Sequence, residues 1–316
     1  MKNIKIATAQ FENRSGDKNY NLSVIDRMSK KAADEGADAI AFHECSITGY
    51  SFARKLSKDQ MLELSEFVPD GPSTRRLQSI AEKNKIAILA GLFEKDESDR
   101  IYKPYLCVDK TGMIARHRKL HPFINEHILP GSSYTVFDLC GWKAGILICY
   151  DNNIIENVRA TKLLGADILF MPHVTMCTPS TRPGAGFVDP ALWENRAKDP
   201  EALRKEFDGL KGRAWLMKWL PARAYDNALY TVFSNPIGMD GDQLKNGCSM
   251  ILDPYGDILA ECRSFDDEYV MATLEPDKLK LAGGFRYIKA RRPELYKDII
   301  GKTHKSEQKV VWLEDA

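Results

Sequence analysis

The sequence predicts an α/β protein in which a mixed β-sheet, or a pair of sheets, is covered by helices. Residues 4–42 show the order strand, helix, strand, and residues 144–171 repeat this order. Between the two blocks, residues 86–93 and 102–108 have the composition of neighbouring strands that pair with each other. Repeated β-α-β order favours parallel strands with helices on their faces, and the intervening hairpin adds antiparallel strands.

The N-terminal elements follow from the spacing of apolar residues. An alternating strand is expected from Ile4 to Phe11 and a buried one from Asp38 to Phe42. Between them, helical spacing followed by a glycine stop signal predicts a helix, on the residues Leu22, Ile25, Met28, Ala32, Ala33 and Gly36. Another helix is expected to begin at residues 71–73 with Ser73 as its N-cap, and residues 110–112 are expected to turn the chain.

In the C-terminal half, a buried strand over residues 144–148 leads into Cys149. A helix over residues 152–167 is expected next, with apolar side chains roughly on one face: Ile154, Ile155, Val158, Leu163 and Leu164. Further elements are a strand at 168–171, a helix at about 212–227 interrupted near Pro221, and strands at 230–234, 249–253 and 269–274. Residues 285–305 are basic and are expected to be extended.

Residues 172–212 interrupt this regular order with prolines, glycines and a polar stretch. A loop of this length inside a compact domain is usually functional. We therefore expect it to act as a lid or substrate loop and, with residues 45–57, to determine specificity.

The composition is typical of a soluble globular protein. Of 316 residues, 44% are hydrophobic and 28% charged, and the net charge is +1. A nearly neutral chain is a poor match for nucleic acid or an anionic membrane surface. The seven cysteines include no CxxC pair, and no apolar run reaches the roughly 20 residues that cross a bilayer. These features predict a cytoplasmic protein with reduced thiols.

Three strand ends each carry a reactive side chain: Glu44, Lys119 and Cys149. A cysteine where a strand gives way to a helix lies at a common ligand-binding position, and a helix N-terminus favours its thiolate. Considered alone, Cys149 could equally well be a small buried hydrophobic residue without a chemical role. A cysteine nucleophile needs a base, which Glu44 can supply, and its oxyanion needs positive charge, which Lys119 can supply. Histidine commonly serves as the base, and several are available: His43, His117, His121, His127 and His173.

The motifs around these residues resemble those of the nitrilase superfamily of carbon–nitrogen hydrolases. They are HECSITGY around Glu44, RHRKLHPF around Lys119 and ICYDNNIIENVR around Cys149, in the family order and at similar spacing. The segments IKIATAQ, ARAYDNALYTVFSNPIG, NGCSMILDPYG and RRPELY extend the likeness over nearly the whole chain. One departure is Ile155 before Glu156, where family members often have proline.

The resemblance implies a fold, an αββα four-layer sandwich of two mixed sheets flanked by helices. It also implies a triad, with Glu44 as general base and acid, Lys119 as oxyanion stabiliser and Cys149 as nucleophile. By position, Glu126 would help to hold Lys119 and the substrate nitrogen, and the backbone N–H of Tyr150 would complete the oxyanion hole.

Two further residues, Tyr50 and His173, are expected to contact the substrate. The implied reaction is hydrolysis of a non-peptide C–N bond in a small linear amide or N-carbamoyl compound, through a cysteine thioester and without a metal or organic cofactor. Residues 1–284 would form the hydrolase domain. Residues 285–316 would be an extension that packs at a subunit interface of a homodimer or larger even-numbered oligomer.

Several alternatives stay open at this point. The substrate could be a nitrile, or the chain could be a non-catalytic homologue that acts as a binding module. Amide transfer to a synthetase is disfavoured because the sequence contains no synthetase domain. The histidines at 117, 121 and 127 could bind zinc, but their loop has no cysteine partner nearby, so no metal site is expected. Other residues are expected to serve packing or an interface: Cys45, Arg159, Trp215, Met217 and Trp219.

Overall fold

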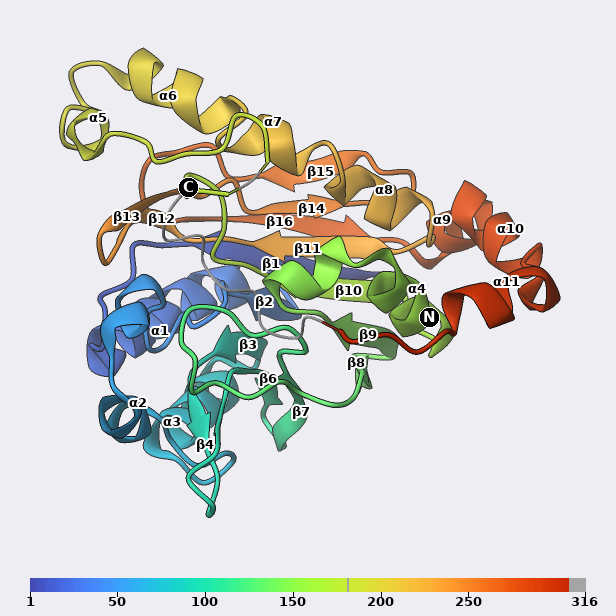
Figure 1. The fold of residues 1–316 in the computed structure, drawn as a ribbon, viewed down its shortest axis with the longest axis horizontal. Helices are drawn as coiled ribbons and strands as arrows, with labels where there is room; N and C mark the ends of the chain where they lie inside the picture. The colour runs from blue at the N-terminus through green and yellow to red at the C-terminus, as the bar shows by residue number, and fades with distance from the viewer. Residues whose placement is uncertain (181, 307–316) are drawn as a thin grey trace.

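The computed structural model describes residues 1–180 and 182–306, which form two stacked six-stranded sheets with helices outside both (Figure 1). In the first sheet the strand order is β16 (Glu268–Leu274), β1 (Ile4–Gln10), β2 (Ala39–Ala41), β3 (Ala87–Gly91), β6 (Pro104–Asp109) and β7 (Gly112–Arg118). In the second it is β15 (Ile258–Glu261), β14 (Met250–Leu252), β11 (Tyr230–Ser234), β10 (Ile168–Pro172), β9 (Trp142–Ile146) and β8 (Thr135–Leu139). This arrangement confirms the αββα sandwich. Two small hairpins join β4 (Glu94–Lys95) to β5 (Ile101–Tyr102) and β12 (Ile237–Asp240) to β13 (Gln243–Asn246).

Each sheet is mixed, with a parallel centre. Strands β1, β2 and β3 run parallel in the first sheet, and β9, β10 and β11 run parallel in the second. Parallel strands bring their carboxyl ends to one edge of a sheet, where α/β proteins place their ligands. Glu44 follows β2 and Cys149 follows β9, so both lie at such edges.

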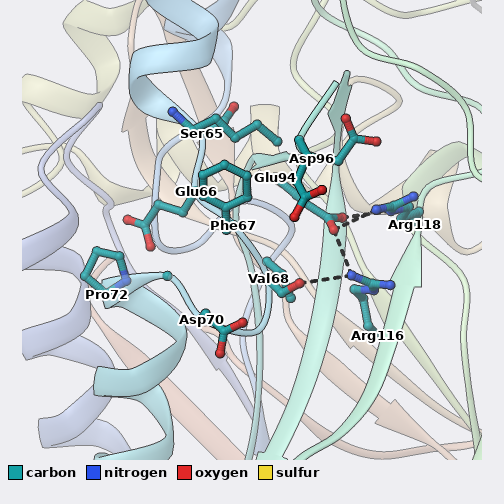
Figure 2. Close-up of a pocket in the computed structure, with 13 residues that line it drawn as sticks. Ser65, Glu66, Phe67, Val68, Asp70, Pro72, Glu94, Asp96, Arg116 and Arg118 are labelled. Carbon is teal, nitrogen blue, oxygen red and sulfur yellow. Dashed lines mark hydrogen bonds and ion pairs between the residues drawn. The ribbon is translucent and has the colours of Figure 1, made fainter. Parts of the chain in front are cut away.

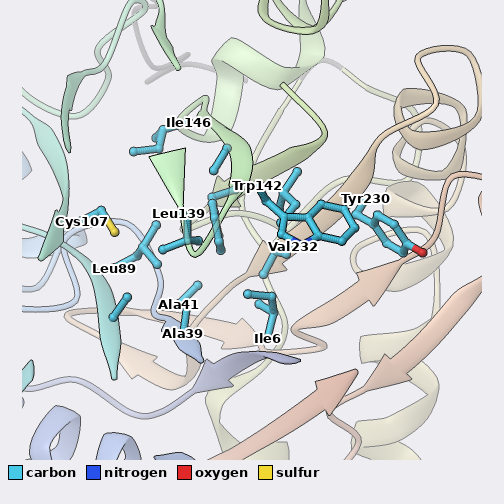
Figure 3. Close-up of a cluster of buried hydrophobic side chains, with 14 of the residues drawn as sticks. Ile6, Ala39, Ala41, Leu89, Cys107, Leu139, Trp142, Ile146, Tyr230 and Val232 are labelled. Atoms are coloured by element: carbon cyan, nitrogen blue, oxygen red, sulfur yellow. The ribbon is translucent and has the colours of Figure 1, made fainter. Parts of the chain in front are cut away.

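An apolar core fills the space between the two sheets. Figure 3 shows Ile6, Ala39 and Leu89 of the first sheet beside Leu139, Ile146 and Val232 of the second. The ring of Trp142 meets that of Tyr230 edge to face at 5.8 Å, and its indole N–H donates to the backbone oxygen of Lys2 at 2.9 Å. Close packing of this kind fixes the relative position of the strand ends that carry the reactive side chains.

Helices α1 (Lys18–Asp34) and α3 (Pro72–Asn84) cover the outer face of the first sheet. Because they cover it, β1 is buried at all but one position and does not alternate as expected. The expected Ser73 cap is also wrong: Gly71 caps α3, with Pro72 in the first turn. Ser73 instead donates its backbone N–H and hydroxyl to the carboxylate of Glu66, at 2.8 and 2.7 Å.

Helices also cover the second sheet: α4 (Ile155–Leu163), α6 (Pro200–Asp208), α7 (Arg213–Leu216) and α8 (Leu220–Tyr225). The segment 172–212 is therefore less irregular than expected, since it contains α5 (Pro190–Glu194) as well as α6. The break near Pro221 is confirmed as the gap between α7 and α8. Trp215, Met217 and Trp219 pack against this outer core.

Of the apolar side chains expected on one face near α4, Val158 is buried, whereas Ile155, Leu163 and Leu164 are exposed. The expectation for the C-terminal segment is wrong. The basic C-terminal segment is not extended, because residues 283–289 form α10 (Gly283–Lys289) and residues 293–300 form α11 (Pro293–Ile300). They follow α9 (Pro276–Leu281). Residues 307–316 of the predicted extension lie outside the described residues, and the boundary at 284 stays a prediction.

The remaining helical elements are η1 (Ser51–Lys55), α2 (Lys58–Leu64) and η2 (Cys149–Asn153). Among the helices of the described ranges, none is long and apolar enough to cross a membrane.

Candidate active site

Glu44 lies where the two sheets meet, in the loop after β2. Its side chain is 1% exposed, and its backbone N–H donates to the oxygen of His173, the residue after β10, at 3.3 Å. Burial acts to raise the pKa of the Glu44 carboxyl, but the ammonium groups of Lys103 and Lys119 outweigh it and hold the pKa at about 2. Glu44 is therefore a buried carboxylate that depends on its cations to stay charged.

Lys119 reaches Glu44 from the residue that follows β7. Its Nζ donates to Glu44 Oε1 at 2.8 Å, and neither side chain is accessible to solvent beyond 1%. Burial acts to lower the pKa of Lys119, but Cys149 and Glu44 raise it above its ordinary value. A fixed ammonium that faces both residues can stabilise negative charge on an oxygen held between them.

Cys149 begins the 3-10 turn η2, between β9 and α4. Its backbone φ is +53°, in the left-handed region that non-glycine residues seldom adopt. Strain of this kind persists only where the surrounding structure holds it, and it commonly marks functional sites. The nucleophile position predicted from sequence is thus a tight turn at the end of a strand, and α4 starts only at Ile155.

Cys149 is protonated in the resting site, whereas a helix N-terminus would favour the thiolate. Burial raises the pKa of its thiol to about 11, and the attraction of Lys119 offsets this only in part. The resting group is therefore a thiol at neutral pH, so a base must take its proton before or during attack.

Asp151, which sequence reasoning passed over, ties this turn to the loop that carries Lys119. Its carboxylate accepts the backbone N–H of Leu120 at 3.2 Å, of His121 at 2.9 Å and of Ile148 at 3.2 Å. Burial acts to raise its pKa, but the nearby imidazoles of His117 and His121 hold it well below its usual range. The only signal in the sequence was a carboxylate two residues after the cysteine.

Lys103 is a second residue that sequence reasoning missed. It immediately precedes β6, its side chain is fully buried, and its Nζ lies 2.9 Å from Glu44 Oε1. A lysine within the otherwise apolar strand region 101–108 was a visible signal. Its link to Glu44 could be found only through the pairing of β6 with β7.

Of the two expected substrate contacts, Tyr50 lies beside the triad. Its side chain is 3% exposed, and the Lys103 ammonium lies 4.4 Å from its ring centroid. His173 is packed more firmly: its Nε2 lies 3.2 Å from the amide nitrogen of Asn152, and its ring is 4.8 Å from that of Phe233. These contacts fit a supporting role, and a contact of either residue with substrate stays a prediction.

The two supporting residues of the prediction follow members of the triad along the chain. Tyr150 follows Cys149, and its ring meets Phe123 edge to face at 5.2 Å. Glu126 lies in an exposed turn of the loop after Lys119. Their roles toward the oxyanion and the substrate nitrogen stay predictions.

Comparison with known proteins finds relatives that are similar to this chain in sequence and in fold. The family model for carbon-nitrogen hydrolases matches residues 5–282. The chain belongs to the carbon-nitrogen hydrolase family. A nitrilase of Pyrococcus abyssi is 27% identical over 275 residues, covering 86% of this chain and 90% of the relative. An (R)-stereoselective amidase of Pseudomonas sp. is 28% identical over 294 residues, 92% of each chain. An amidase structure of the nitrilase superfamily from Nesterenkonia AN1 has a TM-score of 0.68 at 21% identity, covering 93% and 96% of the two chains.

Two of the three histidines considered as metal ligands have other partners in this carbon-nitrogen hydrolase. His121 Nδ1 lies 3.0 Å from Asp151 Oδ1, and His117 Nδ1 lies 3.1 Å from the hydroxyl of Thr135. Within residues 1–180 and 182–306, no three histidine, cysteine, aspartate or glutamate side chains are grouped to hold a metal ion.

A cavity of about 690 Å³ in the carbon-nitrogen hydrolase lies away from the triad, between the start of α3 and strand β7 (Figure 2). Several of its charged groups are paired: Glu94 accepts from Arg116 and Arg118 at 2.8 Å, and Glu66 accepts from Lys18 at 2.8 Å. Such pairing is typical of a structural surface hollow, so the chemistry is expected at Cys149.

Proposed function

We propose that this enzyme hydrolyses the C–N bond of a small linear amide through a thioester on Cys149. The observation that carries the proposal is the buried pair of Lys119 and Glu44 at 2.8 Å, beside a cysteine held at φ +53° at a strand end. A base, a fixed cation and a nucleophile at one place are the groups that acyl transfer requires.

In the first half-reaction, Cys149 attacks the carbonyl carbon while Glu44 takes the thiol proton. The negative charge that forms on the carbonyl oxygen is stabilised by the ammonium of Lys119 and by the backbone N–H of Tyr150. Glu44 then gives its proton to the nitrogen as the C–N bond breaks, and ammonia or an amine leaves.

In the second half-reaction, Glu44 takes a proton from water as the water oxygen attacks the thioester. The C–S bond then breaks, the acid leaves, and the proton returns to sulfur. An N-carbamoyl compound passes through the same steps: its amine leaves in the first half-reaction, and hydrolysis of the S-carbamoyl group gives carbamic acid, which breaks down to carbon dioxide and ammonia. Every proton is moved by a side chain, so no step needs a metal or organic cofactor.

A nitrile is the second candidate substrate, because one relative of the chain is a nitrilase. A nitrile would first form a thioimidate on Cys149. Addition of water and loss of ammonia would convert the thioimidate to a thioester, which a second water would hydrolyse to the acid. An inactive binding module is disfavoured because Glu44, Lys119 and Cys149 are all retained and the first two are in direct contact.

The test is an ammonia-release screen over primary amides, N-carbamoyl amines and amino acids, and nitriles. The matched control is Cys149→Ala on every compound. We expect release from at least one amide or N-carbamoyl compound that the control does not show. Release of ammonia from nitriles alone would mean that the enzyme is a nitrilase and not an amidase. No release from any class of compound would overturn the proposal.

A further inference from the structure

The two buried lysines at the catalytic carboxylate are neighbours across a hairpin. The register of β6 and β7 pairs Pro104 with Arg118, and one step further the Lys119 N–H donates to the Lys103 oxygen at 3.0 Å. Side chains at directly opposed positions project from the same face of a sheet. The hairpin therefore delivers both ammonium groups to Glu44.

Both ammonium groups approach the same oxygen of Glu44. Lys119 Nζ lies 2.8 Å from Oε1 with hydrogen-bond geometry, and Lys103 Nζ lies 2.9 Å from Oε1 as an ion pair. The other oxygen, Oε2, is buried and has no hydrogen-bond partner within the described ranges. A buried, unpaired carboxylate oxygen is costly unless the site uses it.

We propose that Lys103 is a positioning residue that, with Lys119, fixes Glu44 through Oε1 and keeps it ionised, so that Oε2 is the oxygen that moves protons. The inference rests on the proposed function, in which Glu44 is the proton shuttle. Oε2 takes the Cys149 proton as the S–C bond forms and gives it to nitrogen as the C–N bond breaks. It repeats the exchange with water and sulfur, while Lys103 keeps its own protons throughout.

The charges around Glu44 agree with this assignment. The other titratable groups facing it are neutral at neutral pH: burial lowers the pKa values of His43 and His173 to about 3, and burial raises those of Cys45, Tyr50 and Cys149. Lys103 and Lys119 are the two lysines whose Nζ atoms contact the carboxylate, at 2.9 and 2.8 Å. Burial lowers the pKa of Lys103, and the negative charge of Glu44 acts against that shift. Removing either one should raise the proton affinity of Glu44.

The chain offers a matched control for loss of a buried cation. Lys245 in β13 is also 1% exposed, but its Nζ donates to the neutral Gln243 side chain at 2.9 Å. Lys245→Met therefore removes a buried ammonium without touching Glu44. Lys103→Arg keeps the charge at Glu44, while Lys103→Met removes it at similar length.

The test measures the pH dependence of the NMR chemical shift of the Glu44 carboxyl carbon in protein labelled with ¹³C-glutamate. The Glu44 signal is identified as the one that is missing in Glu44→Gln. In Lys103→Met we expect the Glu44 pKa to rise by about one unit or more, whereas Lys245→Met and Lys103→Arg leave it near the wild-type value. In kinetics, the acidic limb of kcat/KM should move to higher pH in Lys103→Met alone. Its value near neutral pH, where Glu44 stays ionised, should fall about tenfold to hundredfold because the carboxylate is no longer held through Oε1 in the position for proton transfer.

An unchanged Glu44 titration in a folded Lys103→Met protein would overturn the inference, as would equal loss of activity in the Arg and Met variants without a shift of the acidic limb. If Lys103→Met fails to fold, Lys103→Gln carries the same expectation. The NMR readout needs no substrate, so it distinguishes failure of this inference from failure of the proposed amide hydrolysis.

Discussion

At the scale of single residues, the proton of the resting site stays on the Cys149 thiol, which must lose it before or during attack. Burial raises the thiol pKa of Cys149 to about 11, while Lys103 and Lys119 overcome burial and hold the carboxyl pKa of Glu44 at about 2. Proton transfer between them is uphill until substrate binds. It becomes favourable as the S–C bond forms and negative charge moves to an oxygen near Lys119. Such a site protects its nucleophile when no substrate is present.

The Cys149→Ala variant should lose hydrolysis and keep its fold, because the nucleophile is removed with only a small change in volume. Losses on the order of 10⁴-fold or more are typical when a nucleophile is deleted. Steady-state ammonia release and a thermal unfolding curve measured on the same sample check both parts. A folded variant that retains a tenth of wild-type turnover would contradict the mechanism.

The two glutamates should respond differently to replacement by glutamine. Glu44→Gln keeps the shape but cannot carry a proton, so acylation and thioester hydrolysis should both slow by roughly 10²- to 10⁴-fold. Glu126→Gln should keep measurable turnover with weaker or misplaced substrate binding, because Glu126 need not exchange a proton. Single-turnover kinetics on both variants separate the two steps. If Glu126→Gln is the inactive variant, the two roles must be exchanged.

At the scale of elements, the site depends on how loops from different strands are joined. The Asp151 carboxylate receives backbone N–H groups from the loop after β7 and from the end of the strand region before Cys149. On the far side of the turn, Arg223 of α8 donates to the backbone oxygens of Asn152 and Asn153 at 2.9 and 3.0 Å. The left-handed conformation of Cys149 is thus held from both sides.

Replacing Asp151 by Asn should loosen this junction. An amide nitrogen would face backbone donors, and leaving buried groups unsatisfied costs about 1–3 kcal/mol. The folded-state pKa of Asp151 is depressed, so its contribution to stability is present above the unfolded pKa of roughly 3.9 and is lost as pH falls below it. Denaturant unfolding from neutral pH to about pH 3 should therefore show a smaller acid-induced loss in the variant. Equal pH dependence in both proteins would contradict this role.

Glu44 and Cys149 were visible in the sequence because each follows an apolar strand, and Lys119 was visible because its motif RHRKLHPF resembles that of the family. The partners of the triad were not visible, because Lys103 and Asp151 act through strand register and backbone contacts between loops. Ser73 was misassigned because Pro72 takes the first helical position and leaves capping to Gly71. Residues 293–300 were expected to be extended because their surroundings are basic, yet Leu295, Ile299 and Ile300 share the spacing of one helix face.

At the scale of the whole molecule, the chemistry proposed here is complete without a metal ion. Hydrolysis should therefore survive dialysis against EDTA, since Glu44 activates the water and Lys119 stabilises the oxyanion. Activity and metal content measured before and after dialysis check this. Stoichiometric zinc that is lost together with activity would revive the interpretation of the loop histidines as ligands.

The surface of the chain indicates how copies would assemble. Large apolar side chains are exposed on or next to α4 and α11: Ile155 (58%), Leu163 (45%), Leu164 (57%), Leu295 (60%), Ile299 (69%) and Ile300 (60%). Both helices, with α8, line a cavity of about 440 Å³. Figure 1 shows α4, α8 and α11 at one end of the molecule. Apolar area of this kind commonly marks a protein–protein interface.

We therefore expect a homodimer or larger even-numbered oligomer that buries α4 and α11, since symmetric pairing covers the same patch on both copies. Light scattering at micromolar concentration should give a multiple of the 35.7 kDa chain mass. The double variant Ile155→Glu, Leu295→Glu should shift the protein toward monomer, because it places charge in an apolar contact. The matched control is Phe67→Glu, which changes an exposed aromatic residue (47%) on the segment before α3 and should leave the mass unchanged. A wild-type protein that scatters as a monomer would refute the assembly, and an oligomer insensitive to the double variant would place the contact elsewhere.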